Sequence, residues 1–214
     1  MARLSGAMVE TIESYLATLA SDEPVPGGGS AATVVAASGA ALVGMVARIC
    51  GRNPKYAGNA ELLRHVVNES DRLRGRLEAA RLRDERAFGN VVAAQRLPKA
   101  NAAEVAERDR ALQAALREAA EEPLETAALA LEVVCAAARL LEVPNKQLVS
   151  DIGCAAEFGY AALAACAYNV RVNHRYLHDP ATIARQAQSL ERCETDGVDA
   201  LARVRRAVAQ ALAS

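Results

Sequence analysis

Apolar residues recur along this chain at steps of three and four, the spacing that places side chains on one face of an α-helix. No stretch alternates apolar and polar residues long enough to indicate a β-strand. Clusters of proline, glycine and asparagine interrupt the helical pattern and divide it into segments. The pattern predicts an all-α fold: a single domain over residues 1–214, built as an antiparallel bundle of six to seven helices with a long central helix.

The interruptions set the expected helix boundaries. Pro98 ends the long third helix, because proline cannot donate a helical hydrogen bond. Asn101 caps the next helix, and Pro123, which suits a first helical turn, begins a new one. The first helix is expected to bury a face formed by Val9, Ile12, Leu16 and Leu19. We expect helices over residues 5–20, 30–50, 59–97, 101–122, 123–143, 181–214 and, from a start between 145 and 150, up to 178.

Two of these helices carry few polar residues. Residues 31–47 hold no charge and consist mostly of Ala, Gly, Ser and Val with a single Leu, and the stretch AALAACAYNV (161–170) is similar. The first stretch is long enough for a marginal membrane span, but its weak hydrophobicity and small side chains favour the centre of a bundle. Because neither helix has a polar face for water, we expect a homodimer that covers them and no membrane association.

Composition excludes several classes of protein. The net charge is −1, aromatic residues make up 3% and Trp is absent, so neither a basic patch nor stacking platforms for nucleic acid are expected. Five cysteines are scattered without a Cys-x-x-Cys pair, which favours free thiols in a reducing compartment. Acidic residues in the N-terminal helix argue against a secretory signal, so we expect a cytoplasmic protein. His174 and His178 have the spacing of a metal-binding pair but no third ligand, and we expect no metal.

Three consecutive glycines, Gly27, Gly28 and Gly29, are followed by Ser30 and open the charge-free helix. The run has neither the lysine of a P-loop nor the spacing of a dinucleotide-binding loop. Glycine is costly in ordered structure, so three together indicate a positive φ or a close approach of the backbone to another group. Free N–H groups at a helix start would favour an anion. The structural alternative is a flexible helix start with Ser30 as its cap.

The long helix places a carboxylate on its apolar face. The inward stripe runs through Leu63, Val66, Ser70, Leu73, Leu77 and Ala80. The next positions on the stripe are Asp84, Phe88 and Val91. A carboxylate in such a place is costly unless it is paired. Asp84 is therefore either a structural ion-pair partner of Arg81 or of a neighbouring helix, or exposed by rotation of the helix, or a functional acid with a shifted pKa.

Further polar residues lie at helix ends or on apolar faces. Lys99 follows the end of the long helix, where the helix dipole favours a cation and where an anionic ligand would find a lone base. Asp151, after Ser150, stands near a helix start, where the pair could act as a cap. Asn169 and Asn173 are four residues apart on an otherwise apolar helix, as buried hydrogen-bonding groups or as ligand contacts.

Short motifs along nearly the whole chain form an ordered set. They are Pro26–Ser30, Gly39–Leu42, Met45–Val46, Asp84 with Ala87–Phe88, Leu97–Lys99, Pro123–Leu124, Asn145, Ser150–Asp151 with Ala155–Ala156, and Asn169–Val170 with Asn173. This set resembles the cyclodeaminase/cyclohydrolase family of folate enzymes, the formiminotetrahydrofolate cyclodeaminases and methenyltetrahydrofolate cyclohydrolases. The chain departs from the family at residues 51–56, at Pro144 where glycine is usual, and at His174 where an aliphatic residue is common.

The resemblance implies an all-helical homodimer that binds a reduced folate, with Asp84 as its catalytic aspartate and no cofactor. The expected substrate-binding residues are Gly27, Gly28, Gly29, Ser30, Lys99, Asp151, Asn169 and Asn173. A methenyltetrahydrofolate cyclohydrolase that yields 10-formyltetrahydrofolate is the first hypothesis, because the chain has no room for a fused transferase domain. A formiminotetrahydrofolate cyclodeaminase that releases ammonia is the second. A non-catalytic folate-binding or dimeric interaction module is the alternative of another class.

Overall fold

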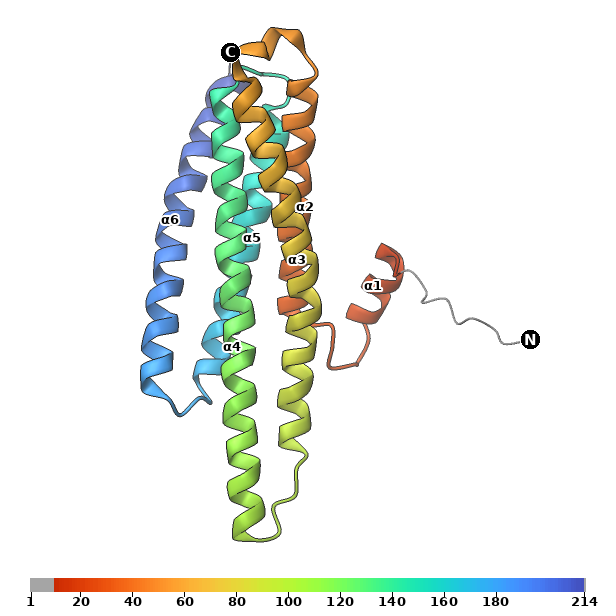
Figure 1. Cartoon of the computed structure of the whole chain (residues 1–214), viewed down its shortest axis with the longest axis vertical. Helices are drawn as coiled ribbons and strands as arrows, with labels where there is room; N and C mark the ends of the chain where they lie inside the picture. Colours follow the sequence, from red (N-terminus) through yellow and green to blue (C-terminus); the bar gives the residue numbers. More distant parts are fainter. Residues whose placement is uncertain (1–9, 214) are drawn as a thin grey trace, which may run out of the picture.

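The computed structural model describes residues 10–213 and shows long helices packed side by side (Figure 1). The helices are α1 (Ile12–Leu19), α2 (Gly28–Gly51), α3 (Ala60–Gln95), α4 (Ala102–Arg139), α5 (Val149–His174) and α6 (Pro180–Leu212). Short 3₁₀ turns, η1 (Pro54–Asn59) and η2 (Leu140–Glu142), follow α2 and α4. No strand occurs within the described residues, and the expected single all-α domain with a long central helix is confirmed.

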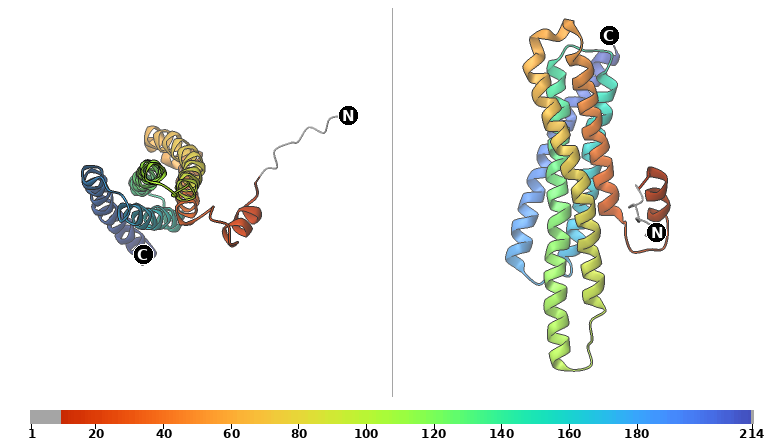
Figure 2. Two further views of the ribbon diagram at one scale, coloured as in Figure 1. Left: turned by 90° about the horizontal axis from the view of Figure 1, so that it is seen from below. Right: turned by 45° about the vertical axis from the view of Figure 1, so that its right-hand side comes forward.

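Helices α2 to α5 form the body of the bundle, and α6 lies outside against α4 and α5 (Figure 2). The main core is built from small and branched side chains that point inward from α2, α3, α4 and α5. The far ends of α3 and α4 extend beyond the other helices as a hairpin (Figure 1). A smaller cluster around Val91 and Leu116 holds this hairpin together. The bundle thus brings the start of α2, the middle of α3 and α4 and the end of α5 to one level.

Helix α1 stands apart from the bundle (Figure 1), and residues 10 and 11, expected within the first helix, precede it, while residues 5–9 lie outside the described residues. It begins at Ile12 because Thr11 caps it: the Thr11 side chain accepts the Ser14 N–H, and the Ser14 side chain accepts the Thr11 N–H. Ile12 and Leu16 are exposed, Val9 lies outside the described residues, and the buried residue is Tyr15. The side chain that α1 buries against the body is thus Tyr15, next to the ion pair of Glu10 with Arg81.

Helix α4 is continuous through Pro123, so the expectation of a separate helix from residue 123 is wrong. The helix runs for 38 residues from its Asn101 cap, whose side chain accepts the Glu104 N–H as the sequence predicted. Pro123 is buried within it. An interior proline removes one helical hydrogen bond, and packing on both neighbouring helices holds the segment straight enough to continue.

Helix α2 is long and apolar enough to cross a membrane by composition alone, but 56% of its most apolar window is buried inside the bundle. It packs on α3, α4 and α5 as a core helix, in agreement with the small side chains of its sequence. Gly39 allows α2 to pack on α5 and α4, because a Cβ there would meet Ala155 and Val133 at about 3 Å, and Gly159 in the same way allows α5 to pack on α4. Among the described residues α2 is the one helix of this kind, and its burial in the bundle explains its apolar composition.

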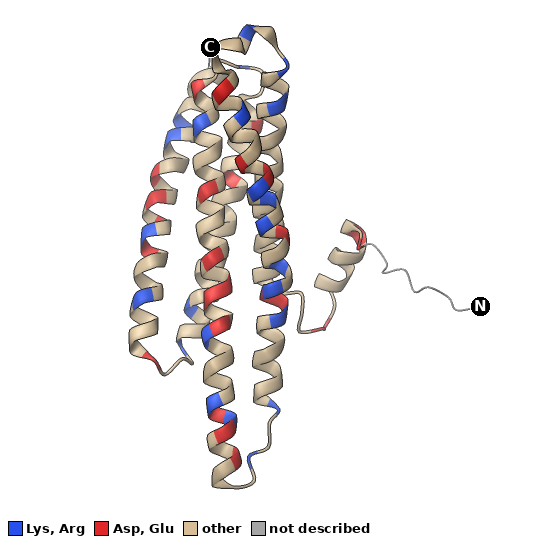
Figure 3. Cartoon of the chain, in the orientation of Figure 1, with Lys and Arg blue, Asp and Glu red and all other residues tan. Residues whose placement is uncertain are grey.

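One face of the bundle remains apolar and exposed. Charged side chains gather on α3, α4 and α6 (Figure 3), whereas α2 carries only Arg48 between Gly28 and Gly51. We call the outer surface of α2 and the adjoining surface of α5 the α2/α5 face. It is formed by Val34, Val35, Ser38, Ala41, Met45, Ile49, Phe158, Ala161, Tyr168 and Val172, all exposed.

Candidate active site

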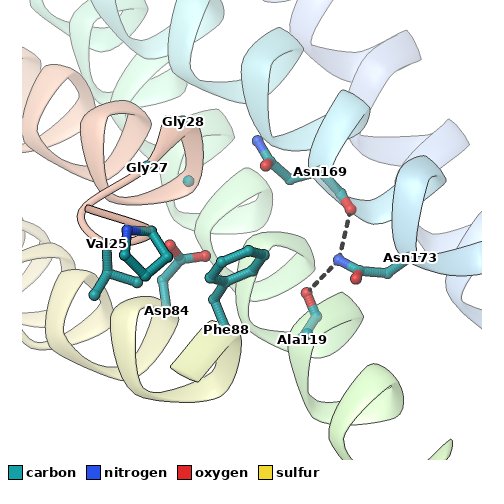
Figure 4. Close-up of a pocket in the computed structure, with 10 residues that line it drawn as sticks. Val25, Gly27, Gly28, Asp84, Phe88, Ala119, Asn169 and Asn173 are labelled. Atoms are coloured by element: carbon teal, nitrogen blue, oxygen red, sulfur yellow. Dashed lines mark hydrogen bonds between the residues drawn. The ribbon is translucent and has the colours of Figure 1, made fainter. Parts of the chain in front are cut away.

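A pocket opens where the start of α2 meets α3, α4 and α5 (Figure 4). Its volume is about 190 Å³, which is smaller than the roughly 300–1,000 Å³ of typical ligand pockets, so it would enclose one end of an extended ligand. Its lining residues are Pro24, Val25, Gly27, Gly28, Gly29, Asp84, Phe88, Ala119, Asn169 and Asn173. Six of the ten come from the expected site.

Gly29 lies directly against the Asp84 carboxyl group. A Cβ at position 29 would stand 2.3 Å from Asp84 Oδ1 and 2.7 Å from its Cγ, so any larger residue would displace the Asp84 carboxyl group from its present position. The same addition at Gly28 would make ordinary contacts with Asn169, and at Gly27 it would meet nothing within 4 Å. All described glycines have φ outside the positive region, so the close approach of Asp84, and not a positive φ, explains the glycine at position 29.

The structural alternative, in which Ser30 caps α2, is wrong. Gly27 is the N-cap, and as a glycine it has no side chain with which to cap the helix. The Ser30 side chain is fully buried and donates to Glu85 Oε1 at 2.7 Å. Its backbone N–H donates to the Asp84 carboxyl group. Ser30 therefore lies behind the pocket wall and ties the start of α2 to α3.

The pKa of Asp84 is raised to about 6, chiefly because burial removes its carboxylate from water. The negative charges of Glu85 and Glu122 raise it further, and the Ser30 N–H lowers it in part. The Cys166 thiol on α5 also faces Asp84, and burial together with the Asp84 charge raises the thiol pKa to about 12. Asp84 can therefore exchange a proton near neutral pH while Cys166 stays protonated.

Arg81 is not the partner of Asp84, so the ion-pair interpretation is wrong. Its guanidinium pairs with Glu85 at 3.0 Å and with Glu10 at 2.6 Å, and it covers the ring of Tyr15 at 5.2 Å. Arg83, on the other flank of Asp84, is held by Glu122 and Glu125 on α4. Arg81 and Arg83 are thus engaged elsewhere, and no cation among the described residues pairs with the Asp84 carboxyl group, which lines the pocket.

Asn169 and Asn173 both reach the pocket from α5 (Figure 4). Asn169 Nδ2 donates to the carbonyl of Ala165 at 2.9 Å. Asn173 Nδ2 donates to the carbonyls of Ala119 on α4 at 2.9 Å and of Asn169 at 2.8 Å. These bonds fix both amides, so the pocket presents two preorganised polar groups opposite Asp84.

Two expected site residues lie elsewhere. Lys99 is exposed in the turn between α3 and α4, and at a rise of 1.5 Å per residue the end of α3 is already about 16 Å beyond Asp84. Asp151 stands in the first turn of α5, about 27 Å along the helix from Asn169 by the same rise. Within the described chain neither residue shares the pocket with Asp84.

The sequence pattern missed three kinds of wall residue. Phe88 was expected inside the core, but it is 44% exposed and lines the pocket beside Asp84 as an apolar platform. Pro24 and Val25 belong to the connection before α2, and Ala119 contributes from α4. Only Phe88 carried a signal, because it shares a stripe with Asp84. Within residues 10–213 no group of three metal-binding side chains occurs, the cysteines are free, and His174 bonds to Gln186.

The chain is similar to known proteins in sequence. The family model described as formiminotransferase-cyclodeaminase matches residues 11–192. The chain is similar to methenyltetrahydrofolate cyclohydrolase of Methylorubrum extorquens, with 38% identity over 85% of this chain and 88% of that protein. It is 28% identical to formimidoyltransferase-cyclodeaminase of Rattus norvegicus over 79% of this chain, which corresponds to 31% of that longer protein.

The fold is shared with a solved structure as well. Formiminotetrahydrofolate cyclodeaminase of Thermotoga maritima superimposes with a TM-score of 0.86 and 26% identity, over 95% of this chain and 98% of that one. The residues that match the family model run from α1 into α6 and include every residue of the pocket. The chain belongs to the formiminotransferase-cyclodeaminase family of folate one-carbon enzymes.

Proposed function

We propose that this protein hydrolyses 5,10-methenyltetrahydrofolate to 10-formyltetrahydrofolate, with Asp84 as general acid and base. The observation that carries the proposal is the Asp84 carboxyl group, half-buried against Gly29 in a pocket lined by two fixed amides, with no cation paired to it among residues 10–213. The choice of substrate is supported by the 38% identity to a cyclohydrolase that the chain matches over most of its length. Gly27 to Gly29, Asn169 and Asn173 are the proposed substrate-binding residues.

The proposed reaction uses one carboxyl group twice. Ionised Asp84 takes a proton from water as the water oxygen bonds to the cationic methenyl carbon between the two nitrogens. Protonated Asp84 then returns this proton to the departing ring nitrogen as its bond to that carbon breaks. The added hydroxyl loses its proton to solvent and becomes the formyl oxygen. A pKa near 6 lets the same group serve as base and acid near neutral pH.

The negative charge at the pocket wall fits a cationic substrate. No Lys or Arg of the described part of the chain lines the pocket, whereas Asp84, Glu85 and Glu122 supply negative charge at or near its wall. A positive methenyl bridge would gain from this field, and the field weakens as the bridge is neutralised during attack. Phe88 offers an apolar surface for a flat ring.

The test is the loss of methenyltetrahydrofolate absorbance with protein, compared with the spontaneous rate in buffer. Turnover in wild type and its loss in Asp84→Asn are expected. Absence of any acceleration by folded wild-type protein would refute the cyclohydrolase assignment, and tight folate binding without turnover would instead identify a binding module. Lys99→Ala and Asp151→Asn should leave turnover intact if each chain forms its own site, because both residues lie outside the pocket.

A second candidate is ring closure of formiminotetrahydrofolate with release of ammonia. The fold match to the Thermotoga maritima cyclodeaminase favours it. Asp84 would deprotonate the attacking nitrogen and protonate the departing ammonia, the same two proton transfers on a related tetrahedral carbon. Ammonia release from the formimino substrate, measured beside methenyl hydrolysis on one preparation, decides which reaction the pocket prefers.

The proposal includes a homodimer in the cytoplasm. The α2/α5 face is apolar and continuous, because α2 and α5 pack against each other and Phe158 lies beside Gly39. A second copy would remove Tyr168, now 73% exposed, and Ile49 from water. The five free cysteines fit a reducing compartment.

A further inference from the structure

Both N–H groups of the Asn173 side chain donate to backbone carbonyls. One goes to Asn169 in the preceding turn of α5, and the other crosses to Ala119 on α4. An asparagine amide has two N–H donors and one oxygen acceptor, so no donor is left for a ligand. The group that Asn173 can offer to the pocket is its Oδ1.

The Ala119 carbonyl can accept from Asn173 because of the residue four positions later in α4. In an α-helix the carbonyl of residue 119 accepts the N–H of residue 123. Residue 123 is Pro123, which has no N–H, and α4 is nevertheless continuous there. The proline therefore frees a carbonyl at the pocket wall, and the Asn173 amide occupies the position of the missing donor at 2.9 Å.

We propose that Pro123 is a positioning residue for the pocket: by freeing the Ala119 carbonyl, it fixes the Asn173 amide with its oxygen available to the ligand. An oxygen in this place selects a ligand group that donates a hydrogen bond. A reduced pterin ring carries such N–H groups, so the inference deepens the proposed function and rests on it for the identity of the ligand. Pro123 itself is buried behind the wall and outside the lining.

The cost of the arrangement favours this interpretation over simple packing. Proline is by far the least favourable residue inside a helix, and one replacement hydrogen bond offsets only part of that cost. Alanine is already the most frequent residue on the buried face of α4. A residue that costs stability at this one position is explained by what it does to Asn173.

The experiment replaces Pro123 with alanine and restores the helical N–H. The first readout needs no ligand: the side-chain amide signals of Asn173, assigned by their loss in Asn173→Ala, are followed by NMR in the free protein. We expect them to shift and to exchange faster with water in Pro123→Ala, while the melting temperature stays equal or rises. The second readout is turnover of methenyltetrahydrofolate, with KM raised about fivefold and kcat within about twofold.

The Asn173→Ala background and a matched proline make the test selective. In Asn173→Ala, the further change Pro123→Ala should alter KM less than about twofold, because the amide it acts on is gone. Pro180→Ala is the control, since Pro180 occupies the first turn of α6, where a missing N–H frees no carbonyl. It should change neither readout.

Unchanged Asn173 signals in Pro123→Ala overturn the proposal, and so does an equal KM effect in the Asn173→Ala background. If Pro123→Ala does not fold, Asn173→Asp replaces it, because it removes both donors and keeps an acceptor. Asn173→Asp should raise KM, and an unchanged KM there overturns the proposal as well. A wild-type protein without turnover refutes the proposed function alone, because the amide signals are measured without substrate.

Discussion

The contact between Asp84 and Gly29 joins the two most informative positions of the chain. Asp84 is held half-buried, and its pKa rises to about 6 because the carboxylate loses water and faces the charges of Glu85 and Glu122. Gly29 allows that placement because it has no Cβ to displace the carboxyl group. A substitution at either residue should therefore affect the other, and three predictions follow at this scale.

Asp84→Asn keeps the shape of the side chain and removes its titration. We expect turnover to fall by roughly 10²–10⁴ while folate binding stays close to that of wild type. The folded-state pKa lies above the ordinary value of 3.8, so the wild-type free energy of unfolding declines as pH rises from about 4 to 6. At neutral pH the Asn variant should thus be more stable by roughly 1–2 kcal/mol. Turnover and melting curves on one preparation check both; near-wild-type turnover removes Asp84 from the mechanism.

Glu85→Gln should move the pH dependence of turnover. The negative charge of Glu85 raises the pKa of Asp84, so its removal should lower that pKa and shift the acid limb of kcat to lower pH. Turnover on the alkaline plateau should stay within about twofold of wild type. The matched control is Glu78→Gln, since Glu78 forms the same pair with Arg74 at 2.9 Å on α3 but away from the pocket. Identical acid limbs in Glu85→Gln and Glu78→Gln would contradict the assignment.

Gly29→Ala should lower stability by about 1–3 kcal/mol and abolish most turnover, because its Cβ would overlap the Asp84 carboxyl group. In the Asp84→Ala background the same change should cost little, because the overlapping Oδ1, Oδ2 and Cγ atoms are absent. Gly27→Ala is the control, with nothing within 4 Å of its added Cβ. Denaturant unfolding of the four variants in the cycle measures the coupling, and an equal cost of Gly29→Ala in both backgrounds would show that the close approach is not real.

At the scale of elements, Tyr15 is the buried contact of α1 with the bundle, beside the ion pair that Glu10 forms just before the helix. A helix of eight residues is not stable by itself in water, and its apolar Ile12 and Leu16 face outward. The Tyr15 hydroxyl bonds to Ser30 Oγ at 2.9 Å, and because Ser30 donates to Glu85, Tyr15 is the donor. These hydrogen bonds therefore link α1 to α3 through Ser30 at the buried start of α2.

Tyr15→Phe should loosen α1 without unfolding the bundle. Loss of the hydroxyl removes a buried hydrogen bond worth about 1 kcal/mol and leaves the Ser30 oxygen without a donor. Hydrogen exchange of residues 12–19 should accelerate, and KM should rise because Pro24 and Val25 of the pocket wall follow α1. Tyr176→Phe, at an exposed tyrosine beyond α5, should leave the exchange unchanged. Equal protection of α1 in Tyr15→Phe and wild type would mean that other contacts hold it.

At the scale of the whole molecule, the α2/α5 face predicts the assembly. Light scattering should give a mass of about 45 kDa, twice the 22.5 kDa of the chain. Val35→Asp places a charge within the face and should produce monomers, because a buried carboxylate without a partner is costly. Leu82→Asp, at an equally apolar exposed residue of α3, should remain dimeric. A monomeric wild type at micromolar concentration would leave the face without this partner.

Several features of the fold and the site could be read from local sequence. The all-helical class, the long third helix, the Asn101 cap and the position of Asp84 on the stripe of α3 depend on residues within one or two turns. The pocket residues Gly29, Asp84, Asn169 and Asn173 were found because each breaks the pattern of its own helix. Pro123 misled the prediction, since an interior proline and a helix start look alike in sequence.

The sequence by itself determined which segments are helical and which polar residues stand on apolar faces, because both follow from the 3.6-residue period. Only the tertiary structure decided which of those residues meet. The axial positions of α2, α3 and α5 bring Gly29, Asp84 and Asn173 to one level, whereas Lys99 and Asp151 lie beyond the pocket on the same helices or their turns. Those positions are set by the packing of small side chains across the whole bundle, which no local pattern contains.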